Sequence, residues 1–264
     1  MQIRRNCQRH IWLLSGTGEG PYIARALIKY GWKVTVSVVS SQAAEPYIDF
    51  SLEELKVGPL DGVKGIKEFL EEAEKHSGFD WVLDATHPFA LNISNNLHHA
   101  CKEFNQALLR YVRPLEDCSG ATLIHSSKEL SHLDMKGQNI LIALGARYLK
   151  EAVQSAKAAG AIVYARIFPT PESLQSALNC NIEPDNLAVV RPQNGELIGD
   201  FEMAICRRWS INGIVCRQSG GKTEKLWIEI SRRRKLKLWL ISRPFYPDKV
   251  ETIHSLNKLL LRID

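Results

Sequence analysis

The sequence predicts an α/β protein with two lobes, each built on a parallel β-sheet that is covered by helices. Short apolar runs of strand length alternate with amphipathic segments of helix length along the chain. Repeated strand–helix–strand units of this kind form parallel sheets with helices on their faces. The chain has 264 residues, of which 45% are hydrophobic and 24% are charged, so it can bury a sizeable core.

The first lobe is expected to contain four strands. The second of these is rich in valine, and Gly31 ends the helix before it, as glycine commonly does at a helix C-terminus. We expect the strands at 11–14, 33–39, 81–84 and 107–112, and the helices between them at 21–30, 63–76 and 91–104.

The alternation starts again after a polar break that begins at Arg113 and Pro114. We expect strands at 139–144, 162–167, 187–190, 213–216 and 236–242, and helices at 148–159, 172–178, 196–209 and 248–261. Nine strands are compatible with one sheet, but the break favours two sheets of four or five strands. It divides the chain into domains at 1–113 and 114–264. Ligands of such folds bind at the carboxyl ends of the strands, so we expect the active site in the cleft between the lobes.

Charge and cysteine content restrict the class of protein. The formal net charge is +5, which is low for a nucleic-acid binder and compatible with a small polyanionic ligand or with no charged partner. The six cysteines form no CxxC pair, so they are expected to be reduced thiols and not metal ligands.

The N-terminus is basic over residues 1–10 and continues into only four apolar residues. This run is too short for a signal peptide, and no segment approaches the roughly 20 apolar residues of a membrane span. The expectation is a cytoplasmic protein with neither a membrane nor a nucleic acid as partner.

A glycine-rich turn joins the first expected strand to the first expected helix. It contains Gly16, Thr17, Gly18, Glu19 and Gly20. Glycines let the backbone approach an anion, and the N–H groups at a helix start point toward one, so the turn is a candidate seat for a dinucleotide pyrophosphate. The spacing departs from GxGxxG because the third glycine comes one position early. A turn without a ligand is the alternative.

The end of the second strand indicates which dinucleotide is bound. Ser37, Ser40 and Ser41 lie in a segment that contains no Asp or Glu, whereas NAD-binding folds usually place an acid there for the ribose hydroxyls. Their hydroxyls suit a 2′-phosphate, so the segment favours NADPH and leaves NADH as the alternative. The missing acid also argues against an S-adenosylmethionine-dependent methyltransferase. No tyrosine has a lysine four residues later, which excludes the short-chain dehydrogenase chemistry.

Two further clusters follow strands. The segment 84–90 contains Thr86, His87 and Pro88, and in the expected fold it lies beside the glycine-rich turn, where it would contact the cofactor. The alternative is that its polar side chains cap the following helix. The second cluster, Ser219, Gly220 and Gly221, suggests an anion-binding nest that would contact the cofactor, and a plain loop explains it nearly as well.

Together these clusters resemble the precorrin-6A reductase family, which includes the cobalt-precorrin-6A reductases. Residues 84–90 match the family's Asp-Ala-Thr-His-Pro-Phe-Ala motif in full. Residues 15–20 are similar to its Gly-Gly-Thr-x-Glu-Gly segment, with Ser15 for the first glycine and an additional Gly18. The resemblance continues in order through 140–145, 164–173, 215–221 and 243–244.

The chain departs from the family mainly in its second half. Arg217 and Gln218 stand where the family usually has Lys and Asn or Asp, and Trp227 stands near a usual lysine. Residues 191–195 replace a Gly-Pro-Phe-Ser-like turn, and residues 232–237 are unusually basic. These departures affect the expected substrate face more than the cofactor face.

The resemblance implies an oxidoreductase of cobalamin biosynthesis that uses NAD(P)H to reduce one carbon–carbon double bond of precorrin-6A, giving precorrin-6B. Residues 1–113 would then bind NADP(H) and residues 114–264 the substrate, a polycarboxylate tetrapyrrole with or without cobalt. Arginine binds carboxylates bidentately, so the candidate clamps lie near strand ends of the second lobe. They are Arg147, Arg166, Arg191 and Arg217, each of which has a solvated surface role as its alternative.

The proton donor stays unassigned. His87 is a candidate because histidine titrates near neutral pH, but the family motif is better explained as a cofactor contact, and water can supply the proton. A nonenzymatic NADP-sensing regulatory protein is the rival interpretation. Transient contact with other enzymes of the pathway, which would hand over the substrate, is left open.

Overall fold

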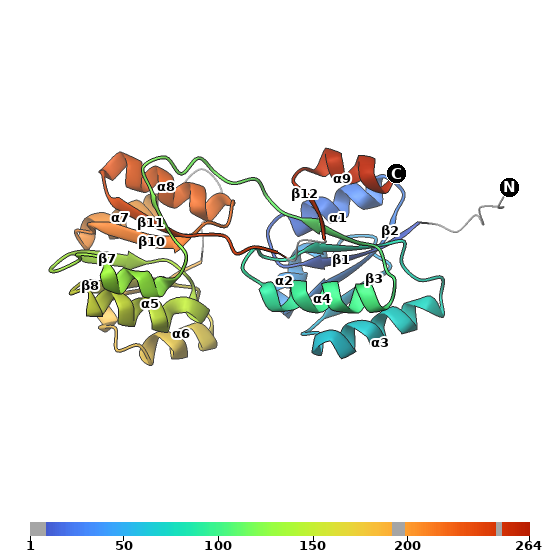
Figure 1. Ribbon diagram of the computed structural model, residues 1–264, viewed down its shortest axis with the longest axis horizontal. Coiled ribbons are helices and arrows are strands. Elements are labelled where there is room, and N and C mark those ends of the chain that lie inside the picture. Colours follow the sequence, from blue (N-terminus) through green and yellow to red (C-terminus); the bar gives the residue numbers. More distant parts are fainter. Residues whose placement is uncertain (1–8, 192–198, 247–249) are drawn as a thin grey trace. The chain divides into compact units, whose positions relative to one another are not determined.

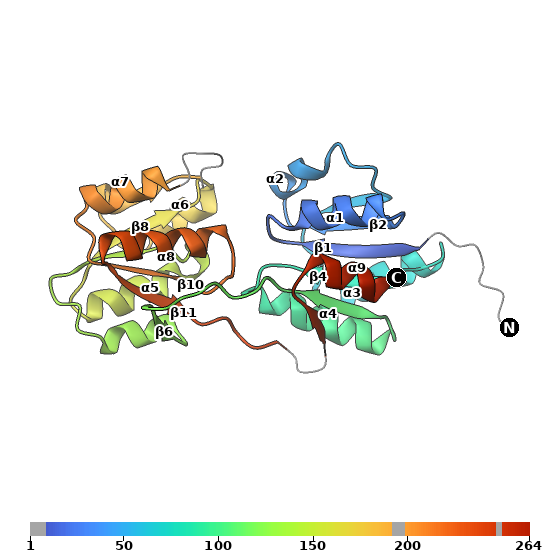
Figure 2. The same cartoon turned by 90° about the horizontal axis from the view of Figure 1, so that it is seen from above.

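The computed structural model describes residues 9–191, 199–246 and 250–264, and the chain divides into two compact units. The first unit contains the chain up to Pro114 together with Pro244–Asp264, and the second unit is Leu115–Arg243. Each unit is a parallel sheet with helices on both faces (Figures 1 and 2). No helix in these described ranges is both long and apolar enough to cross a membrane.

The sheet of the first unit has six parallel strands in the order β12-β5-β4-β1-β2-β3. The strands are β1 (His10–Ser15), β2 (Lys33–Val38), β3 (Glu54–Val57), β4 (Trp81–Ala85), β5 (Leu108–Tyr111) and β12 (Glu251–Ile253). The helices are α1 (Gly20–Lys29), α2 (Ser41–Ala44), α3 (Gly62–Glu74), α4 (Leu91–Glu103) and α9 (Leu256–Ile263), with a 3-10 turn at Glu45–Tyr47.

The central strand β1 is buried on both faces. Ile11 and Leu13 pack against α1 and α9, whereas Trp12 and Leu14 pack against α3 and α4. Such a strand is apolar at every position, which explains why its sequence is a continuous apolar run.

The sheet of the second unit also has six parallel strands, in the order β6-β11-β10-β7-β8-β9. They are β6 (Thr122–Ile124), β7 (Asn139–Ile142), β8 (Ile162–Ile167), β9 (Leu187–Val189), β10 (Gly213–Arg217) and β11 (Lys237–Ile241). The helices are α5 (Ala146–Ala158), α6 (Pro171–Leu178), α7 (Asp200–Arg208) and α8 (Lys222–Arg234), with 3-10 turns at Ser127–His132 and Pro184–Asn186.

The predicted fold class is confirmed, but the predicted number of strands was too small. The strands β3, β6 and β12 were not predicted; they have only three or four residues and lie at sheet edges. Most of their side chains are at least partly exposed. A short edge strand therefore lacks the continuous apolar run that identifies a central parallel strand.

The C-terminal segment corrects the predicted domain boundary and the predicted helix at 248–261. Residues 251–253 form β12, which pairs in parallel with β5, and helix α9 begins only at Leu256. Leu259 and Ile263 of α9 are buried in the core of the first unit. The chain therefore returns to the first unit after Arg243, because this apolar face completes the core over α1.

Some expectations fall outside the described residues. These are the basic stretch 1–8, the turn at 192–195, the start of the helix expected at 196–209, and residues 248 and 249. Within the described ranges that helix is α7, and all five cysteines there are free thiols.

Each sheet has a point where the order of its strands reverses. In the first unit the chain runs from β1 outward to β2 and β3, and then returns to place β4 on the other side of β1. In the second unit the same reversal separates β7 from β10. Loops that leave the carboxyl ends of such strand pairs diverge and leave room for a ligand.

Gly20 is required for packing, whereas Gly18 is not. A Cβ atom on Gly20 would lie 1.8 Å from Ser15 Oγ and 2.2 Å from the Tyr47 hydroxyl oxygen, but a Cβ atom on Gly18 would meet nothing within 4 Å. We predict that Gly20→Ala lowers the free energy of unfolding by about 1 to 3 kcal/mol because of overpacking. Gly18→Ala, the matched control, should leave it nearly unchanged. Urea unfolding of both variants measures this, and equal stabilities would contradict the assignment.

Candidate active site

The glycine-rich turn lies at the strand-order reversal of the first unit, between β1 and α1. Gly16 and Gly18 are exposed, whereas Gly20 is buried at the start of α1. Close helix–strand packing is the role of the third glycine in the standard dinucleotide fingerprint. Gly20 fills that role here one position early. The unusual spacing still leaves the turn before the helix exposed at Gly16 and Gly18, where it suits an anion.

The loop that follows β4 lies against this turn, as the sequence analysis predicted. A Cβ atom on Gly16 would lie 3.2 Å from the backbone nitrogen of His87 and 3.3 Å from Thr86 Cα. Ser15 and Ala85 are register partners at the ends of the two strands. Glycine at position 16 therefore lets the two loops approach backbone to backbone.

Glu19 has a partner in the first unit. Its carboxylate forms an ion pair with Arg113, with 3.3 Å between Oε2 and Nε. Burial raises the pKa of the neighbouring Tyr111, and the charge of Glu19 raises it further. Glu19 thus ties the glycine-rich turn to the residues that follow β5, in agreement with a role in ordering the turn.

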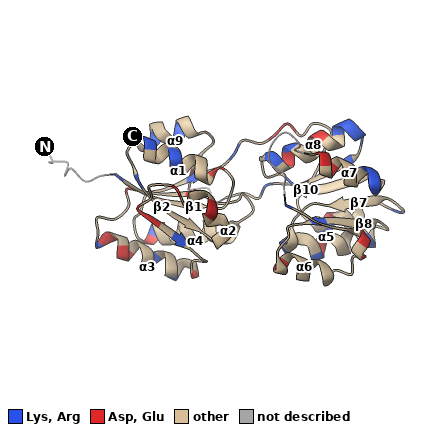
Figure 3. Cartoon of the chain, turned by 180° about the vertical axis from the view of Figure 1, so that it is seen from behind, with Lys and Arg blue, Asp and Glu red and all other residues tan. Residues whose placement is uncertain are grey.

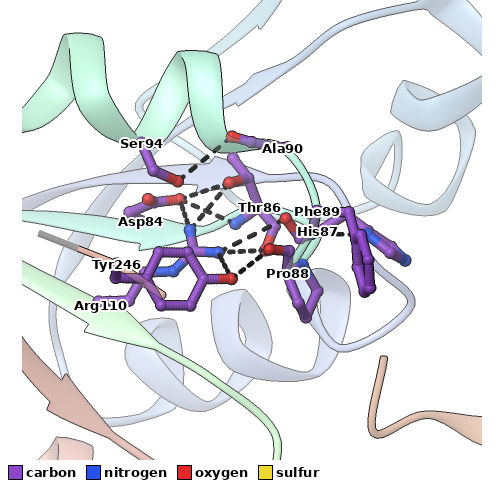
Figure 4. Close-up of polar contacts among 9 residues, drawn as sticks. All are labelled: Asp84, Thr86, His87, Pro88, Phe89, Ala90, Ser94, Arg110 and Tyr246. Atoms are coloured by element: carbon purple, nitrogen blue, oxygen red, sulfur yellow. Dashed lines mark hydrogen bonds and ion pairs between the residues drawn. The ribbon is translucent and has the colours of Figure 1, made fainter. Parts of the chain in front are cut away.

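Asp84 organises the loop that follows β4, the second loop of the site, from inside the protein (Figure 4). Its Oδ1 accepts hydrogen bonds from the Thr86 backbone N–H at 3.0 Å and from the Thr86 hydroxyl at 2.7 Å. It also forms an ion pair with Arg110, and both side chains are almost fully buried. Helix α4 begins after Ala90 without a side-chain cap, so the alternative that Asp84 or His87 caps this helix is not what the structure shows.

Arg110 and Tyr246 complete this cluster, and the sequence analysis missed both. Arg110 Nη1 donates to Thr86 Oγ1 at 2.9 Å, and Nη2 donates to the Thr86 carbonyl at 3.2 Å and to the Tyr246 hydroxyl at 2.9 Å. The Tyr246 hydroxyl donates to the Pro88 carbonyl at 2.5 Å. A charged residue inside the apolar strand at 107–112 was the available signal for Arg110, because a buried charge needs a partner. No local pattern indicated Tyr246.

The three serines after the second strand separate into two groups. Ser37 is buried within β2, and its Oγ accepts a hydrogen bond from Trp12 Nε1 at 2.8 Å. This is a correction, because a side chain held in the core does not reach a ribose. Ser40 and Ser41 are exposed at the carboxyl end of β2, where Ser40 Oγ also accepts from the Ala43 N–H of α2.

The nest predicted at Ser219, Gly220 and Gly221 is filled by the protein itself. Gly220 has a left-handed backbone with φ of 69°, and its N–H donates to the buried carboxylate of Glu224 at 2.5 Å. Burial raises the pKa of Glu224, and the hydrogen bonds from Gly220 and Ser219 oppose that shift. The prediction of a cofactor contact here is corrected, since an internal carboxylate occupies the anion position.

Arg166 is not a surface clamp. It lies in β8 and forms an ion pair with the fully buried Glu202 of α7, with 3.2 Å between Nη2 and Oε1. Burial lowers the pKa of Arg166, and the charge of Glu202 opposes the shift. Arg166 therefore holds α7 on the sheet, which corrects its assignment to the substrate.

The other three predicted clamps follow strand ends of the second unit. Arg147 is exposed at the start of α5, and Arg217 ends β10 with its guanidinium 5.6 Å from the centre of the Tyr148 ring. Burial lowers the pKa of Arg217, and the charge of Arg147 lowers it further. Arg191 is exposed after β9, with its guanidinium 5.8 Å from the centre of the Phe168 ring. The structure thus brings Arg147 and Arg217 together at the reversal between β7 and β10.

The remaining departures from the family pattern have structural roles. Trp227 is fully buried in the core of the second unit. Lys and Arg gather at one end of α8 (Figure 3). These residues are mostly exposed, and Arg232 and Arg233 form ion pairs with Glu229. Cations at a helix C-terminus interact favourably with the helix dipole, so this segment is a solvated helix end.

Glu224→Gln should make stability less dependent on pH. Because burial raises the pKa of Glu224 above 4.5, the unfolded chain ionises first as pH rises. The contribution of Glu224 to the free energy of unfolding of the wild type should therefore fall from pH 4.5 upward and level off above the raised pKa. The variant keeps an acceptor for Gly220 and lacks this fall, so its advantage should grow toward neutral pH in urea unfolding. A difference that does not vary with pH would contradict this.

Comparison with known proteins agrees with this geometry. Residues 10–263 match the family described as "Precorrin-6x reductase CbiJ/CobK". A cobalt-precorrin-6A reductase from Synechocystis sp. (strain ATCC 27184 / PCC 6803 / Kazusa) is 29% identical over 221 residues, which cover 82% of this chain and 81% of that protein. A precorrin-6A reductase from Mycobacterium tuberculosis (strain CDC 1551 / Oshkosh) is 26% identical over 266 residues, with 94% of each chain covered.

A solved structure named CobK precorrin-6A reductase has the same fold. It superimposes with a TM-score of 0.75 at 21% identity, over 97% of this chain and 96% of that one. The family match extends over nearly the whole chain and includes both units. This chain therefore belongs to the precorrin-6x reductase family.

Proposed function

We propose that this protein reduces one carbon–carbon double bond in the macrocycle of precorrin-6A, or of its cobalt form, with NADPH as the donor. The observation that carries the proposal is the contact between the two loops of the first unit. The complete family motif at 84–90 lies against the exposed glycine-rich turn, at the strand-order reversal of a parallel sheet. This is the position at which such folds bind a dinucleotide.

The residues of the first unit suit a nicotinamide dinucleotide. The turn that leads into α1, with Gly16, Thr17 and Gly18, would hold the pyrophosphate at the start of the helix. Thr86, His87 and Pro88 would contact the same ligand from the neighbouring loop. When bound, the reduced nicotinamide supplies a hydride, and the protein supplies its position and surroundings.

The carboxyl end of β2 supports NADPH over NADH. Ser40 and Ser41 are exposed there, and the first acid after β2 is Glu45, which lies in the 3-10 turn beyond α2. Hydroxyls and backbone N–H groups accommodate a 2′-phosphate, whereas a carboxylate at the strand end would repel it and bind a ribose diol.

The second unit offers cations for a polycarboxylate macrocycle. Arg147 and Arg217 lie near one another after β7 and β10, and Arg191 follows β9. Tyr148 and Phe168 place aromatic rings beside two of these guanidinium groups. Arginine recognises carboxylates bidentately, and its planar group packs on rings, so this edge suits a flat anionic substrate.

The chain's own contribution to the chemistry is mainly positioning. The first unit would orient the dinucleotide and the second unit would bind the carboxylates, which lowers the entropic cost of bringing two reactants together. No side chain is assigned as the proton donor. The ring nitrogen Nδ1 of His87 accepts a hydrogen bond from the Phe89 N–H at 3.2 Å, so a neutral His87 ring carries its proton on Nε2.

Three departures from the family pattern, at Arg217, Gln218 and Trp227, favoured the rival interpretation of a nonenzymatic NADP sensor. Two of these three have structural roles. Trp227 belongs to the core, and Gln218 is buried with its side-chain oxygen accepting from the Arg243 N–H. Both departures therefore have structural explanations.

The proposal predicts a cofactor-dependent change in the macrocycle. Purified protein mixed with NADPH and precorrin-6A, or cobalt-precorrin-6A, should oxidise one NADPH per macrocycle reduced, which absorbance spectroscopy follows at both chromophores. NADPH should have a lower KM than NADH because the end of β2 lacks an acid. No turnover of either substrate form with either nucleotide would overturn the proposal.

Substitution of two arginines of the second unit should have different effects, because Arg217 is a proposed substrate contact and Arg166 belongs to an internal ion pair. Arg217→Gln should raise KM for the macrocycle about 10-fold or more, since a charge-assisted hydrogen bond contributes about 1.5 to 3 kcal/mol. Kd for NADPH should not change. Arg166→Gln should lower the free energy of unfolding by about 3 to 5 kcal/mol, because it leaves the buried Glu202 unpaired. Steady-state kinetics and urea unfolding distinguish these effects, and an unchanged KM in Arg217→Gln would remove this residue from the site.

A further inference from the structure

The first unit contains a buried ionic cluster that hydrophobic packing does not explain. It consists of Asp84, Thr86, Arg110 and Tyr246, and Arg110 is only 1% exposed (Figure 4). Removing two charges from water is expensive, and well-packed apolar residues often serve stability equally well at such a position. A buried pair of this kind is therefore better explained by the geometry that it imposes on its neighbours.

The cluster acts on the backbone carbonyls of the second loop. Arg110 Nη2 donates to the Thr86 carbonyl at 3.2 Å and reaches the His87 carbonyl at 3.5 Å. The Tyr246 hydroxyl donates to the Pro88 carbonyl and itself accepts from Arg110. The two side chains thus hold the Thr86 and Pro88 carbonyls, whereas the His87 carbonyl between them is held mainly by the Ala90 N–H at 2.8 Å.

Holding the Thr86 carbonyl also sets the direction of the His87 N–H. The peptide between them is planar and trans, so its carbonyl oxygen and its N–H point in opposite directions. The carbonyl faces Arg110, and the His87 nitrogen lies 3.2 Å from the place where a Cβ atom on Gly16 would be. Arg110 therefore directs the His87 N–H away from the core, on the side of the glycine-rich turn.

The hydrogen bond to the Pro88 carbonyl fixes the orientation of the His87 imidazole in the same way, through a planar peptide. The carbonyl of the peptide that joins Pro88 to Phe89 accepts from Tyr246. The N–H of that peptide points the other way and donates to His87 Nδ1 at 3.2 Å. A backbone N–H can only donate, so Nδ1 must accept, and the neutral ring is kept as the tautomer that is protonated on Nε2.

We propose that Arg110 and Tyr246 are positioning residues for cofactor binding, which act through the Thr86–His87 and Pro88–Phe89 peptides to orient the backbone N–H and the imidazole of His87. This inference rests on the proposed function, because it takes His87 as a contact of the dinucleotide. Arg110 and Tyr246 themselves touch neither reactant.

Tyr246 makes this inference testable because its hydroxyl can be removed alone. It lies 136 residues from Arg110 and 158 residues from Pro88 in the sequence, in the segment that returns to the first unit. Tyr246→Phe keeps the ring over the Arg110 guanidinium, 4.4 Å from its centre. It removes only the hydroxyl, which donates to the Pro88 carbonyl and accepts from Arg110.

Thr35→Val is the matched control. Thr35 is buried in β2 of the same unit, and its hydroxyl forms one side-chain hydrogen bond, to His10 Nε2 at 3.0 Å. The change is nearly isosteric and, like Tyr246→Phe, removes a single hydroxyl group together with its side-chain hydrogen bonding. Thr35 belongs neither to the glycine-rich turn nor to the loop at 84–90. The loss of its hydroxyl should therefore lower the melting temperature without changing the affinity for NADPH.

The experiment compares full-length wild type, Tyr246→Phe and Thr35→Val by calorimetric titration with NADPH and by thermal unfolding. Tyr246→Phe should raise Kd for NADPH about fivefold, the size expected for one neutral hydrogen bond, and Thr35→Val should not change it. KM for the macrocycle should be the same in all three. Long-range ¹H–¹⁵N spectra should show the Nε2-protonated tautomer of His87 in the wild type and in Thr35→Val, and a mixture of tautomers in Tyr246→Phe.

The outcomes separate this inference from the proposed function. If the wild type binds NADPH and both variants bind it equally well with the same His87 spectrum, Tyr246 is merely structural and the inference is overturned, whereas the proposed function stands. If the wild type binds neither NADPH nor NADH, the cofactor assignment fails and the inference fails with it.

Discussion

The buried guanidinium of Arg110 is the constraint on which the candidate cofactor site depends. A charge enclosed in a parallel sheet must be paired and hydrogen-bonded. The groups within its reach include the Asp84 carboxylate, two hydroxyls and the carbonyls of the adjacent loop. Satisfying this charge draws the loop carbonyls inward and leaves the His87 nitrogen beside Gly16. The geometry of the loop at 84–90 thus follows from the electrostatics of a residue outside the motif.

The glycine-rich turn shows how a departure from a sequence fingerprint can preserve its physical roles. Gly16 allows close approach to a neighbouring backbone, that of the loop after β4. Gly20 allows close helix–strand packing, over Ser15 and Tyr47. Gly18 performs neither role, since the space around its Cα is open. Counting glycines at fixed intervals therefore tests the fingerprint less well than asking what each glycine contacts.

The central strands, the two-sheet architecture and the contact between the two loops were predictable, because a strand buried on both faces is an unbroken apolar run and loops at carboxyl ends share an edge. The edge strands β3, β6 and β12 were not, since strands of three or four residues that are mostly exposed carry no such signal. The filled nest at Gly220 was predictable in principle. Glu224 stands at the third position of α8, where an acid commonly accepts from backbone N–H groups before the helix. Tyr246 was unpredictable because its partners are more than 130 residues away.

Arg166 and Arg217 show why residue type alone does not identify a substrate contact. Arg166 lies within β8, one position before its last residue, and its side chain meets Glu202 of the helix layer. Arg217 is the last residue of β10, at the edge where the chain leaves the sheet beside Gly145 and Tyr148. Inside a covered strand a cation must be neutralised by the protein, whereas at the carboxyl end it can also serve a ligand. The position of an arginine along its strand therefore decides its role more than its charge does.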